Sequence, residues 1–357
     1  MSQNWMRHFE LQLVDAKGNA TDFGSFKVTF TIDWFNLSSE TRVGTFKVYN
    51  LAADTVNRIV GDEFTRIRVI AGYDGIAADV SASQVGTARS VNPDDVGQMD
   101  GRNYGLIFDG EIRYTITGKD NPIDSFVLIQ AADSDRAFAT SITAQTLAAG
   151  YTVADVNTAL MKDFNAKGAT EGSTPAMPAT VYPRGRVLFG MTRHLMDNVA
   201  DQCQADWMFV DGKREMVAKN EVVHDAIKLN SSTGLIGMPQ QTIGSGVNVR
   251  CLINPNIRVN GLIELNQASV YRTVLGNNDI AMTQGRITDQ NNNGNITVEG
   301  TTAQPASIAT DGVYIVRGIM YTGDTRGQAW YMDMMCEARG ARDLISASAL
   351  NRGGGGE

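Results

Sequence analysis

The chain has 357 residues, of which 43% are apolar and 20% charged, and its formal net charge is −8. This balance is typical of a globular protein of two or three domains and argues against a disordered chain. The acidic charge, without a cluster of Lys and Arg, argues against sequence-specific nucleic-acid binding. The sequence contains no run of eighteen apolar residues, so it predicts no membrane span. The N-terminus lacks the apolar core of a secretory signal, so we expect synthesis in a cytosol.

The first 138 residues predict one mainly antiparallel β-domain. Its clearest strand is residues 25–34, where apolar residues occupy every second position: Phe26, Val28, Phe30, Ile32 and Trp34. Such alternation places them on one face of a strand. Further strands are predicted at residues 43–49, 66–73, 106–117 and 124–131. Residues 50–60 favour a short helix with Val56, Ile59 and Val60 facing inward, and residues 76–103 predict a long surface loop because they have no steady period.

Residues 139–230 predict a small α/β domain. Thr152 and Asp155 form a variant of the capping box, and Val156, Leu160 and Phe164 follow at helical spacing, with Gly168 as the stop. A second helix is predicted from apolar residues at every fourth position: Val187, Met191, Leu195, Val199 and Cys203. Asp211 and Gly212 separate two apolar runs, which predicts a hairpin with a two-residue loop.

Residues 231–342 predict a second β-domain. Val247, Val249, Cys251 and Ile253 alternate with other residues, and Asn254-Pro255-Asn256 supplies a turn. A further strand is predicted near the end, from the alternation of Trp330, Met332, Met334, Cys336 and Ala338. Residues 343–357 end in four glycines and one glutamate, and we expect them to form a flexible tail.

Side chains suited to catalysis are present without a catalytic motif around them. The histidines, His8, His194 and His224, favour surface or structural roles. Two carboxylate clusters, Asp109 with Glu111 and Asp133 with Asp135, stand at strand ends, where acidic residues usually cap backbone groups. Cys203, Cys251 and Cys336 are far apart and predict core residues rather than a disulfide or zinc site. The sequence therefore predicts no catalytic or cofactor-binding residue.

One segment resembles half of a calcium-binding loop. Residues 289–294 place oxygen-bearing side chains before a glycine, as an EF-hand does. The loop needs an acidic residue at its twelfth position, which is Gly300, and Glu299 falls one residue short. An Asn- and Gly-rich hairpin tip is therefore favoured and no metal ligand is predicted, although ion binding at residues 289–299 is left open.

A longer stretch carries a family resemblance. Residues 233–242 (Thr-Gly-Leu-Ile-Gly-Met-Pro-Gln-Gln-Thr) and residues 246–255 (Gly-Val-Asn-Val-Arg-Cys-Leu-Ile-Asn-Pro) resemble a segment of baseplate hub proteins from contractile-tailed phages. These hub proteins are related in fold to the spike proteins of type VI secretion. Residues 106–112, 126–135 and 323–330 agree with this resemblance, and residues 237–255 are its distinctive part.

The resemblance implies two tail-tube-like β-barrel domains with a small α/β domain between them. It also implies a non-catalytic homotrimer, a ring that adapts a hexameric tail tube to a trimeric central spike in the virion baseplate and borders the DNA passage. The implied partners are a tube or adjacent tail protein, the spike and other baseplate proteins, with a tape-measure protein left open. No cofactor is implied. The two β-domains show no obvious sequence similarity to each other, so their duplication rests on the family.

Three alternatives stay open at this point. A tube or distal-tail protein would assemble as a hexamer. A glycan hydrolase would use an acid pair from the two carboxylate clusters. A cell-surface binding module would use residues 76–103 as its recognition loop.

Overall fold

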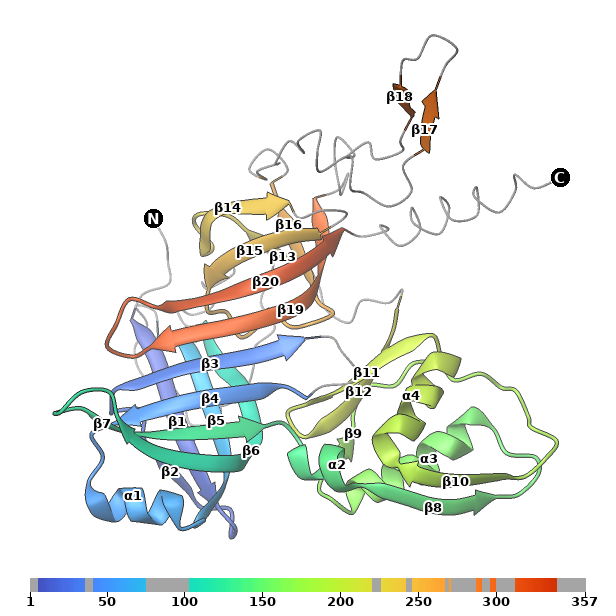
Figure 1. Cartoon of the computed structure of the whole chain (residues 1–357), viewed down its shortest axis with the longest axis horizontal. Coiled ribbons are helices and arrows are strands. Elements are labelled where there is room, and N and C mark those ends of the chain that lie inside the picture. Colours follow the sequence, from blue (N-terminus) through green and yellow to red (C-terminus); the bar gives the residue numbers. More distant parts are fainter. Residues whose placement is uncertain are drawn as a thin grey trace.

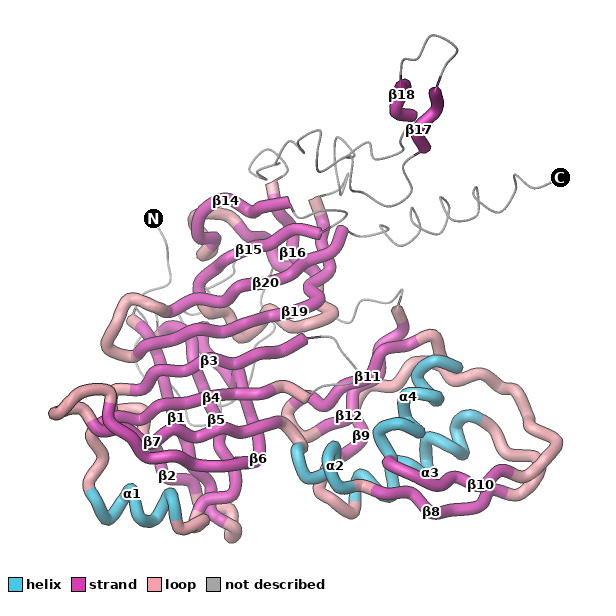
Figure 2. The backbone as a smooth tube through the Cα atoms, viewed as in Figure 1, coloured by secondary structure: helices cyan, strands magenta, loops and turns pink. Residues whose placement is uncertain are grey.

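The computed structural model describes residues 6–35, 41–74, 103–219, 226–241, 246–266, 270, 287–290, 296–299 and 312–338. Strands dominate this part of the chain, which confirms the predicted mainly β class. Figure 1 shows a large sheet with a smaller unit of helices and short strands beside it, and Figure 2 separates the two kinds of element by colour. The described residues contain no helix that is long and apolar enough to cross a membrane.

Thirteen strands form the large sheet. The first half of the sheet consists of β1 (Arg7–Asp15), β2 (Ala20–Asp22), β3 (Val28–Phe35), β4 (Val43–Tyr49), β5 (Phe64–Tyr73), β6 (Asn103–Lys119) and β7 (Ser125–Ala132). The second half consists of β13 (Ala226–Leu229), β14 (Leu235–Gln241), β15 (Gly246–Leu252), β16 (Leu262–Leu265), β19 (Val313–Asp324) and β20 (Trp330–Ala338). Neighbouring strands are antiparallel, except that β13 and β16 are parallel.

The two halves share one strand order. The first half runs β3-β4-β7-β6-β5-β1, and the second runs β14-β15-β20-β19-β16-β13. With strands ranked by their place in the chain, leaving out the short β2 at the edge, the two orders are identical. Residues 29–35 of β3 pair with residues 318–324 of β19, so the halves join in one continuous sheet. The domain boundaries at residues 138 and 230 stay predictions.

The alternating patterns place the core as predicted. Val28, Phe30, Ile32 and Trp34 are buried, whereas Phe26 precedes the strand and is 37% exposed. In the second half the buried side chains of β15 are Val247, Val249 and Cys251, and those of β20 are Trp330, Met332, Met334, Cys336 and Ala338. These residues belong to one hydrophobic cluster that extends through both halves. Period-two patterning therefore predicted the buried face correctly.

The predicted first helix is α1 (Ala53–Val60). Ile59 is buried and Val56 half-buried against the sheet, but Val60 is 44% exposed, so its predicted inward position is wrong. Ile59 and Val60 are adjacent in sequence and lie about 100° apart around a helix, which turns Val60 toward solvent. The predicted loop lies outside the described residues except for Asn103, which begins β6.

An inserted unit separates the two halves in sequence. It consists of α2 (Asp135–Thr140), β8 (Ile142–Leu147), α3 (Val153–Asn165), β9 (Thr170–Glu171), β10 (Arg186–Met191), α4 (Thr192–Gln202), β11 (Ala205–Val210) and β12 (Lys213–Ala218). It has its own hydrophobic cluster, which includes Val156, Leu160 and Phe164 of α3. Thr152 and Asp155 form the predicted capping box at the start of α3. The Asp211-Gly212 loop is confirmed, with φ of +52° and +81° as a type I′ hairpin requires.

The second predicted helix is partly wrong. Residues 186–191 form β10, paired with β8, and α4 begins only at Thr192. Burial in β10 alternates: Leu188 is 1% exposed and its neighbours Val187 and Phe189 are exposed. The spacing of four from Val187 to Met191 suits a strand as well as a helix, because four is also a multiple of two. Val199 alone of the predicted helical face is fully buried.

One predicted turn is confirmed, and the strands on both sides of another are paired. β17 (Ile287–Gln290) and β18 (Ile296–Glu299) pair antiparallel, as a hairpin around the Asn- and Gly-rich tip requires, although residues 291–295 lie outside the described residues. At Asn254 the side-chain oxygen accepts the Asn256 N–H at 3.0 Å and the backbone oxygen accepts the Ile257 N–H at 3.2 Å. The predicted tail, residues 343–357, is also outside the described residues.

Candidate functional site

The four carboxylates that the sequence singled out accept hydrogen bonds from arginines or backbone amides. Asp109 contacts Arg66 at 2.8 Å and Arg68 at 3.2 Å. Glu111 accepts the backbone N–H of Arg136 in the first turn of α2 at 2.6 Å. Asp135 pairs with Arg113 at 2.6 Å, and Asp133 forms the centre of a larger network. The structure thus brings them together between the sheet and the inserted unit, in backbone-capping and ion-pair roles.

Asp133 follows β7 and is fully buried. One oxygen accepts Arg42 Nη2 at 3.0 Å and the Asp211 N–H at 2.6 Å. The other accepts the Gly212 N–H and Ser134 Oγ, each at 3.0 Å. Asp133 therefore binds both amides of the β11–β12 hairpin loop, which fixes that loop to the end of the sheet.

Arg42 connects three parts of the chain. It pairs with Asp133 and Asp211, donates to the Ile107 carbonyl of β6 at 3.2 Å, and its guanidinium lies 4.9 Å from the Trp34 ring centre. Arg258, in the second half, reaches the other oxygen of Asp211 at 3.5 Å. Arg42, Asp133, Asp211 and Arg258 are named the Arg42 junction below. This junction joins both halves of the sheet to the inserted unit.

The charges of the Arg42 junction are strongly perturbed. Burial raises the pKa of Asp133 to about 6, although the Arg42 charge opposes that rise. Burial acts in the same direction on Asp211, but Arg42 and Arg258 hold the pKa of that carboxyl below its usual range. A raised carboxyl pKa also occurs in catalytic acids. Here both oxygens of Asp133 are engaged and the side chain has no exposed surface, so the arrangement fixes a loop and offers no acid to a substrate.

A charged cleft of about 490 Å³ lies next to the Arg42 junction. Its walls come from the sheet and the inserted unit, and its charged residues are Arg66, Glu111, Asp135, Arg136 and Lys167. Both acids already accept hydrogen bonds from protein groups, and Arg136 donates to the Lys167 carbonyl at 3.2 Å. Across the described ranges, no group of three or more His, Cys, Asp or Glu is placed to hold a metal ion.

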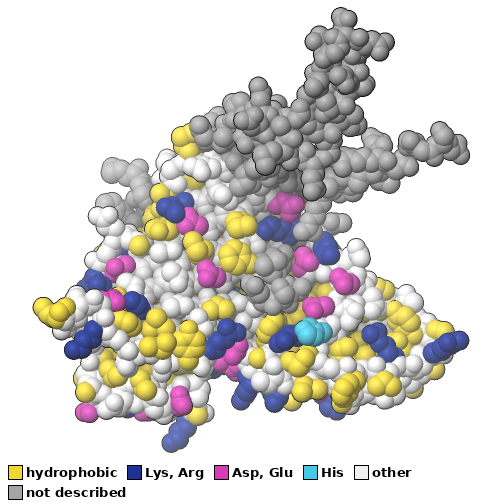
Figure 3. Space-filling view, viewed as in Figure 1, with side chains coloured by type: hydrophobic (Ala, Val, Ile, Leu, Met, Phe, Trp, Pro, Cys, Tyr) yellow, Lys and Arg dark blue, Asp and Glu magenta, His cyan; other side chains and the backbone are white. Residues whose placement is uncertain are grey.

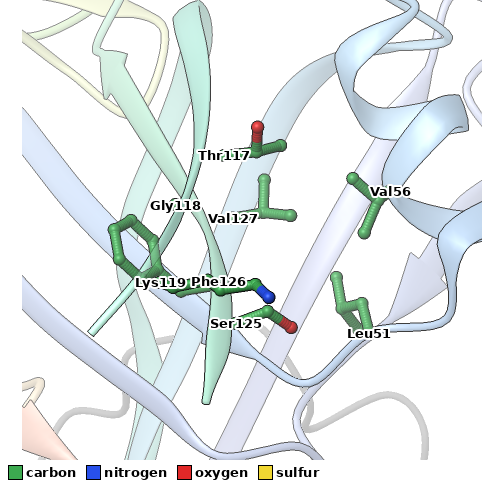
Figure 4. A pocket seen from close by; sticks show the side chains of 8 residues that line it. All are labelled: Leu51, Val56, Thr117, Gly118, Lys119, Ser125, Phe126 and Val127. Atoms are coloured by element: carbon green, nitrogen blue, oxygen red, sulfur yellow. The ribbon is translucent and has the colours of Figure 1, made fainter. Parts of the chain in front are cut away.

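A second, mostly apolar pocket of about 340 Å³ lies between α1 and the β6–β7 hairpin. Figure 4 shows Leu51 and Val56 on one side, facing Thr117 and Val127 on the other. Gly118, Lys119, Ser125 and Phe126 complete the wall at the tip of the hairpin. No titratable group other than Lys119 lines it, so its chemistry suits an apolar side chain rather than a reaction.

The cysteines and the two described histidines lie apart from these cavities. His8 is half-buried between Asp74 at 2.7 Å and Glu10 at 3.0 Å, and its ring stacks on Tyr104. His194 is exposed on α4, and His224 lies outside the described residues. Cys251 and Cys336 are buried core residues, as predicted, and Cys203 is half-buried.

Sequence reasoning missed an exposed apolar face on the inserted unit. Ile142 of β8 is 61% exposed, and Val187 and Phe189 of β10 are 69% and 78% exposed. These three side chains share one face of the two-stranded β8–β10 sheet. Figure 3 shows hydrophobic side chains gathered over this unit. The signal was the alternation of residues 186–191, which the helical interpretation concealed.

Exposed apolar side chains also mark two strands of the large sheet. On β6, Tyr114 and Ile116 are 44% and 52% exposed, and on β14, Ile236 and Met238 are 38% and 60% exposed. A long exposed strand edge with apolar side chains is a site for pairing with another chain. Since the four carboxylates that the sequence singled out are engaged with arginines or backbone amides, such surfaces are the candidate functional sites.

Comparison with known proteins finds likeness in fold alone. No family model matches the sequence, and no curated protein sequence matches it. Among solved structures, the 43 kDa tail protein of prophage MuSo2 from Shewanella oneidensis is similar with a TM-score of 0.51 and 7% identity, over 94% of this chain and 99% of that one. A tail protein from Neisseria meningitidis MC58 gives 0.49 and 9%, over 94% and 98%.

A chain of a PdpA–VgrG complex is also similar, with a TM-score of 0.50 and 6% identity, over 94% of this chain and 66% of that one. These likenesses extend along nearly the whole chain, not only the stretch around residues 237–255 that first suggested the family. The chain therefore has the fold of the prophage MuSo2 tail protein and of the PdpA–VgrG chain, and the resemblance to tail hub proteins is confirmed as a likeness of fold.

Proposed function

We propose that this chain is the structural hub of a phage tail baseplate, and that three copies form a closed ring. The observation that carries the proposal is the strand order shared by the two halves of the sheet. Three chains with two like halves present six similar units to a hexameric tube and keep threefold symmetry toward a trimeric spike. The similar fold of the prophage MuSo2 tail protein supports a place in the tail.

The hub acts by symmetry adaptation, without making or breaking a bond. Its partners are the other two copies, the tube or an adjacent tail protein, the central spike and other baseplate proteins, with the tape-measure protein as a further candidate. The net charge of −8 suits a wall beside passing DNA, because like charges repel and prevent sticking. The chain would be made in the bacterial cytoplasm and function in the virion.

The mass of the purified assembly tests this proposal. Native mass spectrometry of the full chain should give three times the 38.6 kDa chain mass. A hexamer would favour the alternative of a tube or distal-tail protein, and a monomer at micromolar concentration would contradict the ring. Imaging of an intact particle with this chain tagged should then place the tag at the baseplate.

A glycan hydrolase is the second candidate function. The acid clusters give it no support, because Asp109, Glu111, Asp133 and Asp135 are engaged with arginines or backbone amides. The test is incubation of the full chain with purified peptidoglycan. Release of soluble fragments by the wild type, lost in Glu111→Gln, would overturn the non-catalytic proposal.

A further inference from the structure

Among the described strands, two edges of the large sheet without a partner strand are that of β14 and that of one end of β6. In the order β14-β15-β20-β19-β3-β4-β7-β6, eight strands lie side by side, and Figure 1 shows them stacked from β14 at the top to β6 at the bottom. β14 pairs only with β15. Beyond Glu111, β6 pairs only with β7, so its other edge at residues 112–119 has no partner strand in the part of the chain that the structure describes.

The same edge is paired in the second half. β19 corresponds to β6 in the shared strand order, and β3 corresponds to β14. Residues 318–324 of β19 pair antiparallel with β3 on the edge opposite β20. The β19–β3 pair therefore joins the equivalents of β6 and β14 within one chain. The pair that β6 and β14 themselves would form is not made within the described part of the chain.

The position of one side chain follows from this correspondence. Phe30 of β3 pairs with Gly323 of β19, and Gly323 also pairs with Trp330 of β20, next to the β19–β20 loop. The Phe30 ring packs edge-on against the Trp330 ring, at 5.7 Å between centres. The equivalent ladder pair in the first half is Lys119 with Ser125, and both residues line the apolar pocket of Figure 4. That pocket occupies the place that Phe30 fills in the second half.

β14 carries a side chain suited to the pocket. Leu235 of β14 pairs with Cys251 of β15, and Val28 of β3 pairs with Val48 of β4. Leu235 is therefore equivalent to Val28 in the comparison of the two halves. The register shifts between Ile236 and Gln240, so a bulge of Gly237, Met238 and Pro239 stands where β3 has Phe30. Met238 is 60% exposed, and a flexible thioether adapts well to an irregular apolar cavity.

We propose that β14 of one copy pairs antiparallel with residues 112–119 of β6 in the next copy, and that its Met238 enters the pocket lined by Leu51, Val56, Phe126 and Val127. The proposal rests on the trimeric ring proposed above and names its interface. Each copy offers one edge of each kind, so the contact is head-to-tail and closes into a ring instead of forming a symmetric dimer. Both edges would then have a partner strand, as β3 and β19 have within the chain.

A double cysteine variant tests the contact directly. Met238 should lie opposite Lys119 of the next copy, as Phe30 lies opposite Gly323, and both residues are exposed in a single chain. Mild oxidation of the full-length Met238→Cys, Lys119→Cys variant should link three chains, seen as dimer and trimer bands on a denaturing gel. Of the native cysteines, Cys251 and Cys336 are buried, and burial raises the pKa of both thiols, so they stay unreactive. The half-buried Cys203 is replaced by Ser in both cysteine variants.

The matched control keeps Lys119→Cys and moves the second cysteine to Met335, a methionine of β20 that is 54% exposed but lies at neither edge. This control variant should stay unlinked.

In a second experiment, Met238→Glu should abolish the trimer in native mass spectrometry with unchanged circular dichroism, and Met238→Leu should retain the trimer. If the wild type is a trimer and only the control pair links, or Met238→Glu assembles normally, this interface is wrong and the proposed function stands. If the wild type is not a trimer, the proposed function itself fails.

Discussion

The two halves of the sheet share a strand order but differ in what their equivalent edges contact. In the second half, β19 pairs with the chain's own β3, whereas residues 112–119 of the equivalent strand, β6, have no partner on that edge among the described residues. Three equivalent positions show the difference: Trp330 against Ser125, Gly323 against Lys119, and Ala338 against Asp133. The shared strand order thus includes a closed intramolecular contact in one half, and the proposed contact with the next copy would use the equivalent edge of the other.

Trp330 gives the largest expected effect. It is 2% exposed and packs edge-on against both Phe9 and Phe30, so it fixes β1 and β3 to the second half. Trp330→Ala should lower the free energy of unfolding by about 3–5 kcal/mol, because a large cavity is left in the core. Urea denaturation measures it. The equivalent Ser125→Ala should change stability by less than about 0.5 kcal/mol, and equal costs would contradict the asymmetry.

Asp133 tests the attachment of the inserted unit. Asp133→Ala leaves Arg42 with Asp211 as its only carboxylate and removes the acceptor of two loop amides. We expect a loss of about 3 kcal/mol, as for other broken buried ion pairs, and faster hydrogen exchange at the β11–β12 loop. The control Asp135→Ala removes a partly exposed pair with Arg113 and should cost less than about 1 kcal/mol. Unchanged exchange at the loop would show that the Arg42 junction does not hold it.

Gly323 tests the closeness of the intramolecular strand pair. A Cβ at this position would lie 2.2 Å from the Phe30 ring, so the ring must shift to admit it. Gly323→Ala should therefore cost about 1–3 kcal/mol, as overpacked core positions do. Lys119→Ala at the equivalent, open position should be within about 0.5 kcal/mol of the wild type. Differential scanning calorimetry of the two variants compares the closed and open edges directly.

Much of the fold was predictable where one pattern repeats over several residues. The strands around Phe30, Val249 and Met334 alternate for three or more periods, and the capping box at Thr152 needs only local bonds. Short strands such as β13 and β16, with four residues each, carry too few periods to be recognised.

The site was less predictable than the fold. The Arg42 junction joins residues 91 and 78 positions apart, and no local pattern specifies which arginine meets which acid. The clusters around Asp109 and Asp133 were predicted as backbone caps, but their arginine partners were not. The shared strand order was invisible in sequence because the halves keep their strand pairing while their side chains differ, as Ala338 and Asp133 do. Such a strand order depends on hydrogen bonding along the backbone and on the alternation of buried residues, which many different side chains satisfy.

The smallest expected effect is on the pH dependence of the free energy of unfolding. Asp133 contributes such a dependence in the first half, whereas its equivalent in the second half, Ala338, has no titratable group. The pKa of Asp133 is about 6 in the folded chain, above its ordinary value of 3.8, so folding takes up a proton between these values. The stability due to this group is therefore fully present below about pH 4 and is lost as the pH rises through 6. Asp133→Asn cannot titrate, so the stability difference between wild type and variant should shrink by about 1–2 kcal/mol from pH 4.5 to 7.

His8 and Glu215, whose pKa values are also raised, occur in both proteins and cancel in the difference. Urea midpoints at the two pH values measure it, and a difference that grows with pH would mean that the Arg42 charge outweighs burial at Asp133.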